Sequence, residues 1–331
     1  MKNKIKFGFL IPHFGSIASS DKITSTCKLA EEYNFDSAWA RDHLVFGPHA
    51  HEDSDKTFLE PFTVLGHVAS VTKKLELGTA VINPQRHPVH LAQQWASLDY
   101  LCDAGVICGI GTGSYPREFL ERPFDKREQL VKENVEIMRS IWTGSDTEYR
   151  GEIFDIEYAE IYPRPKKPIP IWSGGSTPAS PNRAVEYCDG WLPGRINLKT
   201  WDIAVRAMQK KADDMGRKMP TLGVIPDVSP AKDRKTAIEM ADIENLLKLA
   251  NKRKYWKRPE KGSFETVEDL EGLVMAGTSE EIVQEISKYV DHEIGVDHMV
   301  FDLRQRFSDI EYCIRTIGEE VIPEFFLTIN P

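Results

Sequence analysis

The 331-residue chain carries a formal net charge of -9, and 41% of its residues are hydrophobic. This acidity argues against a general affinity for nucleic acid or for anionic membranes, and no apolar run is long enough to span a bilayer. The five cysteines are scattered without a CxxC pair, which is typical of reduced thiols. We therefore expect a cytoplasmic protein with no leader peptide.

Short apolar runs alternate with amphipathic stretches along the whole chain. The runs have the length of buried strands and cover residues 5–11, 35–40, 75–81, 106–110, 168–172, 190–192, 222–225 and 299–303. Helical patterns follow them: Asp21 is the expected N-cap of the first helix, Pro61 and Pro181 open two others, and Ser308 caps the last. Residues 147–161 alternate around a glycine and predict an added β-hairpin.

Eight strands joined by crossover helices predict an α/β fold, a (β/α)₈ TIM barrel with insertions, in which the strands are parallel. A core of this size commonly forms one domain, here residues 1–331. Residues 231–276 lie between the seventh strand and the next helix and are polar and basic in the middle. They are predicted to be an insertion outside the core and, with residues 44–59, a cover over the site.

In such a barrel, chemistry takes place where the strands end. The residues at four consecutive strand ends are Asp42 and His43; Thr79, Ala80 and Val81; Gly111, Thr112 and Gly113; and Ser173, Gly174, Gly175 and Ser176. Small residues let the backbone approach a flat ring, and a Ser-Gly-Gly-Ser turn before a helix offers N–H and hydroxyl groups to an anion. The pattern predicts a planar, phosphorylated ligand across strands two to five. Asn83, Arg86 and His87 either reach that ligand or cap the following helix.

A metal-dependent hydrolase is a second interpretation. His49 and His51 stand beside several acidic residues, and all of these are ligand-type side chains. This HxH pair lies inside a loop and not at a strand end, so a solvated loop is favoured and no metal site is predicted.

The chain resembles a known family through five motifs. They are WARDH (39–43), LGTAVINPQRHP (77–88), GVICGIGTG (105–113), PIPIWSGGS (168–176) and RAVEYCDGWLP (183–193). In this order and spacing they are similar to the bacterial luciferase-like family of flavin- and deazaflavin (coenzyme F420)-dependent oxidoreductases, over nearly the whole chain. The resemblance implies a small-molecule substrate bound over the cofactor ring and a homodimer.

The same resemblance implies roles for the strand-end residues. Asp42 would bind the cofactor, and His43 would face the substrate or move a proton. A cis peptide bond would fall between Ala80 and Val81, beneath the ring. The cofactor phosphate would lie on Gly174, Gly175 and Ser176, and the remaining contacts would come from Thr79, Asn83, Gly111, Thr112, Gly113 and Ser173.

The chain also departs from part of the family. Relatives that oxidise glucose 6-phosphate have a glutamate where this chain has Ser114 and a tryptophan where it has Gly47. Oxidation of a sugar phosphate is therefore not expected. F420 is favoured as the cofactor, with FMN and a monooxygenase reaction using O2 as the alternative. A non-catalytic flavin-binding barrel is the alternative from another class.

Overall fold

The computed structural model describes residues 4–43, 57–113, 124–144 and 146–327. Eight parallel strands form a closed barrel: β1 (Lys6–Leu10), β2 (Ser37–Ala40), β3 (Glu76–Thr79), β4 (Val106–Ile110), β7 (Ile171–Gly174), β8 (Gly190–Leu192), β9 (Thr221–Val224) and β12 (His298–Phe301). The strand order is β1-β12-β9-β8-β7-β4-β3-β2, and β1 also pairs with β2. The predicted eight-stranded α/β barrel is confirmed.

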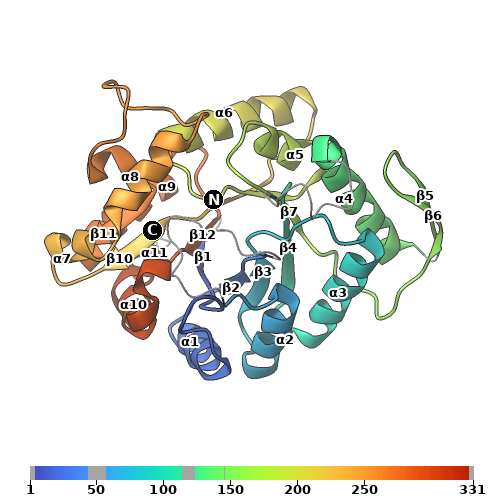
Figure 1. Cartoon of the computed structure of the whole chain (residues 1–331), viewed down its shortest axis with the longest axis horizontal. Helices are drawn as coiled ribbons and strands as arrows, with labels where there is room; N and C mark the ends of the chain where they lie inside the picture. Colours follow the sequence, from blue (N-terminus) through green and yellow to red (C-terminus); the bar gives the residue numbers. More distant parts are fainter. Residues whose placement is uncertain (1–3, 44–56, 114–123, 145, 328–331) are drawn as a thin grey trace.

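Helices surround the strands as an outer ring (Figure 1). They are α1 (Ser20–Glu32), α2 (Pro61–Val71), α3 (Pro88–Leu101), α4 (Arg127–Thr143), α5 (Ala179–Tyr187), α6 (Leu198–Asp214), α9 (Ser279–Val290), α10 (Ile310–Thr316) and α11 (Glu324–Leu327). Pro61 opens α2 as predicted, but three other starts differ. Ser19 caps α1 in place of Asp21, α5 begins two residues before Pro181, and Ser308 lies in a 3₁₀ turn before α10. In the described part of the chain, no helix combines the length and the apolar composition that crossing a membrane requires.

Large aromatic side chains fill the middle of the barrel. The rings of Trp39 and Trp172 lie 5.6 Å apart, and the His298 ring lies 5.5 Å from each of them. Glycines on neighbouring strands make room for these rings, since a Cβ at Gly190 would lie 2.6 Å from the Trp172 ring. This aromatic layer separates the two ends of the barrel.

The predicted hairpin is present as β5 (Thr147–Arg150) and β6 (Asp155–Ala159), and it projects beyond α4 (Figure 1). The buried Glu133 side chain of α4 holds its turn. That carboxylate accepts backbone N–H groups from Glu152, Ile153 and Phe154 at 2.8–3.1 Å. These hydrogen bonds outweigh the effect of burial and lower the pKa of Glu133.

The segment between β9 and α9 contains a small sheet that the sequence did not reveal. Its two ends form β10 (Asp227–Pro230) and β11 (Val274–Gly277), which pair in parallel outside the barrel. Between them lie α7 (Arg234–Glu239), α8 (Ile243–Lys252) and a 3₁₀ turn, Val267–Leu270. A four-residue run that contains aspartate and proline does not have a typical strand composition.

Candidate functional site

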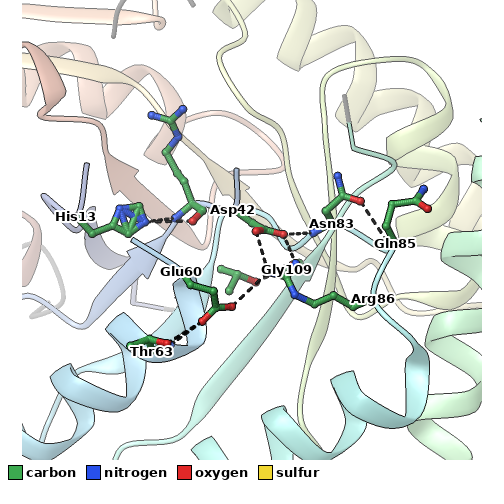
Figure 2. Close-up of polar contacts among 10 residues, drawn as sticks. His13, Asp42, Glu60, Thr63, Asn83, Gln85, Arg86 and Gly109 are labelled. Atoms are coloured by element: carbon green, nitrogen blue, oxygen red, sulfur yellow. Dashed lines mark hydrogen bonds and ion pairs between the residues drawn. The ribbon is translucent and has the colours of Figure 1, made fainter. Parts of the chain in front are cut away.

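Asp42 follows β2, and its carboxylate holds the loop after β3. Its Oδ2 accepts a hydrogen bond from the Asn83 backbone N–H at 2.7 Å and another from Arg86, while its Oδ1 lies 3.0 Å from Arg86 Nη2. Arg86 also reaches Glu60, the residue that caps α2, at 3.2 Å (Figure 2). The side chain of Asp42 is only 1% exposed. A buried carboxylate is stable here because the guanidinium and the backbone N–H satisfy it.

The strand-three bulge lies beside this ion pair. The peptide bond between Ala80 and Val81 is cis, as the resemblance implied. Ala80 N–H donates to the Ala40 carbonyl at 2.8 Å, and Ile82 N–H donates to the Gly109 carbonyl at 2.7 Å. The bulge is thereby fixed to β2 on one side and to β4 on the other.

The Val81 side chain accounts for two of the predicted glycines. A Cβ at Gly111 or at Gly174 would come within 2.7 Å of Val81 Cγ2. These glycines therefore make room for a valine of the protein itself, which differs from the sequence interpretation that they admit a ligand. Val81 in turn becomes part of the surface that a ligand would meet.

A cavity of about 180 Å³ joins the ends of β2, β3 and β4. It is lined by Asp42, His43, Ala80, Val81, Ile82, Asn83 and Gly113. Thr112 is half-buried in the loop beside it. Ser114, Gly47, His49 and His51 lie outside the described residues, as do most of residues 44–59.

His43 is positioned by an arginine from the same strand end. Arg41 Nη2 lies 3.0 Å from His43 Nε2, and the His43 ring packs against Phe58 at 4.8 Å. A guanidinium can only donate, so His43 Nε2 is the acceptor and the imidazole is neutral in this contact. The Arg41 backbone N–H contacts the buried His13, whose pKa falls to about 3, first through burial and then through the nearby Arg41 and His43.

Two predicted residues direct their hydroxyls elsewhere. Thr79 Oγ1 donates to the Gly109 carbonyl at 2.7 Å and links β3 to β4. Ser173 Oγ is buried against α5, where it donates to the Ser180 carbonyl at 2.9 Å and accepts from Arg183 Nε at 3.2 Å. Neither side chain lines the cavity.

The turn after β7 leaves one end of α5 open. Gly175 has a φ of 107°, which favours glycine, and its N–H donates a hydrogen bond to the Leu192 carbonyl at 3.3 Å. The Ser176 hydroxyl makes no hydrogen bond to any residue that the structure describes, and α5 has Pro178 at its N-cap, with no side-chain cap among those residues. The ability to bind an anion therefore falls on Ser176, Thr177 and the start of α5.

The other half of the barrel mouth contains a charged cluster that sequence reasoning missed. Arg195 pairs with Asp227 at 2.5 Å and with Asp302 at 3.2 Å, and Arg304 pairs with Asp302 at 2.5 Å. Burial would raise the pKa of Asp302, but the two guanidiniums outweigh it and hold that pKa far below its ordinary value. The sequence did contain a signal for this cluster, because these four residues lie at or just after the ends of predicted strands, where functional residues are expected.

The described residues suit a flat ring with a phosphate. Apolar Ala80 and Val81 line the cavity together with polar Asn83 and His43, and the open start of α5 lies on the same rim of the barrel. Among the described residues, no group of three or more His, Cys, Asp or Glu side chains is arranged to hold a metal ion.

Comparisons with known proteins identify the family and the fold. A family model described as luciferase-like monooxygenase matches residues 5–298. The F420-dependent glucose-6-phosphate dehydrogenase of Nakamurella multipartita is 27% identical over 340 residues, which cover 94% of this chain and 95% of that protein.

Two solved structures share the fold. The coenzyme F420-dependent tetrahydromethanopterin reductase of Methanopyrus kandleri has a TM-score of 0.79 at 22% identity, covering 97% of this chain and 99% of that one. The oxygenating constituent of 3,6-diketocamphane monooxygenase of Pseudomonas putida, in complex with FMN, has a TM-score of 0.75 at 16% identity, covering 97% and 98%.

Proposed function

The chain belongs to the luciferase-like monooxygenase family, and from this premise we propose that it transfers a hydride between coenzyme F420 and a small organic substrate. The cavity that joins Asp42, His43 and the Ala80–Val81 bulge carries the proposal, because it offers a floor for the ring and a histidine beside it. The choice of F420 draws on relatives named as F420-dependent enzymes. When bound, the cofactor supplies a ring carbon that gives or receives a hydride.

His43 is the proposed proton carrier. Its Nε2 lone pair is held by Arg41 in this structure, so a substrate hydroxyl must replace Arg41 before His43 can take its proton. In the opposite direction, the protonated ring would return that proton to a carbonyl oxygen. Arg41 is thus a positioning residue that holds the imidazole neutral until the substrate arrives.

Asp42 is proposed to act through the loop after β3. Both of its oxygens contact Arg86, and one also contacts the Asn83 backbone, so the carboxylate fixes the loop that carries Asn83. The side chain of Asn83 lines the cavity and would supply a polar contact to the edge of the ring.

Separate titrations of the full chain with F420 and with FMN, followed by absorbance, test the proposal. We expect tight binding of F420 and, with F420, a spectral change on addition of a panel of alcohols or carbonyl compounds. Binding of FMN alone would favour the monooxygenase alternative. Binding of a cofactor without turnover of any compound would favour the non-catalytic barrel.

A further inference from the structure

A second cavity opens at the opposite end of the barrel, where the strands begin. Its volume is about 770 Å³, which is within the range of small-molecule sites. Its lining includes Lys6 of β1, Glu76 of β3, Ile107 of β4, Trp172 of β7, Thr221 of β9 and His298 of β12. The layer of Trp39, Trp172 and His298 separates it from the candidate functional site.

The walls of this cavity are rigid and apolar. Trp142 of α4, Ile169 and three prolines, at positions 165, 168 and 170, form much of the lining. Tryptophan and proline lose little conformational freedom on binding, and their flat surfaces suit a planar apolar body.

His298 presents a ring nitrogen at the floor. The residue is 2% exposed, and its Nε2 lies 2.7 Å from Ser37 Oγ. Ser37 Oγ accepts from Trp39 Nε1 at 2.8 Å and keeps a second lone pair and its own proton, so it can pair with either neutral tautomer of the His298 ring. Burial, and then the charge of Lys6, lowers the pKa of His298 to about 3, so the ring is neutral. Nδ1 makes no hydrogen bond to the described residues, and a ligand hydroxyl, which can donate and accept, would satisfy it in either tautomer.

The rim carries unbalanced positive charge. Two of its cations are paired, Lys6 with Glu76 at 2.5 Å and Arg139 with Asp189 at 2.8 Å. The Asp297 carboxylate accepts the Leu222 backbone N–H. Three further lysines on the lining, Lys4, Lys166 and Lys167, have no carboxylate of the described residues within ion-pair distance; Lys4 Nζ lies 3.7 Å from the centre of the Phe326 ring, and Lys166 Nζ lies 3.5 Å from the Cys102 carbonyl oxygen.

We propose that this cavity binds an aromatic carboxylate that carries a hydroxyl group at its far end. The ring lies between Trp142 and the prolines, the hydroxyl meets His298 Nδ1, and the carboxylate lies at Lys166 and Lys167. The site is separate from the proposed redox reaction and does not depend on it.

Calorimetric titration of the full chain with 6-hydroxy-2-naphthoate tests the proposal. Reversing two charges on the rim with K166E/K167E should weaken binding about tenfold or more. The charge-matched control K210E/K235E changes lysines of α6 and α7 that do not line the cavity, and it should leave the affinity unchanged. The neutral 6-hydroxy-2-naphthamide and the hydroxyl-free 2-naphthoate should each bind more weakly to the unaltered protein.

Three results would overturn the proposal. The first is no binding of 6-hydroxy-2-naphthoate at millimolar concentration, and the second is equal affinity in K166E/K167E and the unaltered chain. The third is equal weakening by both double variants, which would indicate nonspecific attraction between charges. If K166E/K167E instead dissociated an oligomer and the probe never bound, the face would be an interface between copies.

Discussion

Both halves of the barrel mouth contain buried aspartate–arginine ion pairs, but the pairs stabilise different structures. In the half formed by β2 and β3, Asp42 and Arg86 hold one loop in place and leave a cavity beside it. In the half formed by β8, β9 and β12, Arg195 bridges Asp227 and Asp302 and so joins three strand ends. The same pair of residue types therefore fixes a single loop in one half of the mouth and joins three strand ends in the other.

Removal of the His43 imidazole is expected to have the largest effect. His43→Ala should slow turnover about 10²–10⁴-fold, because the proposed proton carrier is lost, and should leave F420 affinity nearly intact. Steady-state rates and cofactor titrations measure the two quantities separately. His67→Ala removes an imidazole on α2 that contacts Thr24 at 2.8 Å, and it should leave the rate unchanged. An unaltered rate in His43→Ala would remove His43 from the mechanism.

Matched changes to the two ion-pair systems should separate stability from binding. Asp302→Asn leaves Arg304 without its carboxylate partner in a buried setting, and should lower the free energy of unfolding by about 3 kcal/mol. Arg86→Met leaves the Asp42 carboxylate, which is 1% exposed, without its guanidinium, so it should also lower the free energy of unfolding by about 3 kcal/mol. The two variants should differ in binding: Arg86→Met should weaken F420 binding about tenfold by releasing the loop that carries Asn83, with partial recovery in Arg86→Lys, whereas Asp302→Asn should leave F420 affinity nearly unchanged. Urea denaturation and cofactor titration measure these effects, and the comparison fails if Asp302→Asn weakens F420 binding as much as Arg86→Met.

His13 and Asp302 should also respond to different ranges of pH. His13 is neutral in the folded protein, whereas in the unfolded chain it takes up a proton near pH 6.5, so its contribution to stability falls as the pH drops below that value. Between pH 6.5 and 5 this amounts to about 2 kcal/mol. Asp302 has a depressed pKa, so its contribution is complete above about pH 4, the unfolded value, and is lost as the pH falls further toward the folded pKa.

Chemical denaturation across this pH range measures both contributions. His13→Asn should flatten the loss of stability between pH 6.5 and 5, and Asp302→Asn should flatten the loss below pH 4. Identical pH profiles for the two variants would show that His13 and Asp302 do not contribute in separate pH ranges.

The barrel could be predicted from the sequence because its strands are continuous apolar runs and its helices have regular apolar spacing. The strand-end rule placed Asp42, His43, Ala80 and Val81 at one rim, where the structure brings them around one cavity. The rule could not tell that Ser173 points toward α5, or that Gly111 and Gly174 face Val81, since both depend on the direction of side chains across strands. The β10–β11 pair was missed because Asp227–Pro230 contains an aspartate and a proline, which are depleted in strands, and because the pairing joins segments more than 40 residues apart.

The smallest expected effect distinguishes two serines three positions apart. Ser173→Ala removes a hydroxyl bound to Ser180 and Arg183, so it should lower the free energy of unfolding by about 1 kcal/mol and leave F420 affinity within about twofold. Ser176→Ala removes a hydroxyl with no hydrogen bond to the described residues, so stability should hold while F420 affinity falls about threefold to tenfold. Both variants remove one serine hydroxyl, so a difference between them in stability or in F420 affinity reflects only the position of that hydroxyl. If Ser173→Ala weakened F420 binding more than Ser176→Ala, the phosphate would lie deeper in the turn, against β7, and the open start of α5 would not be its site.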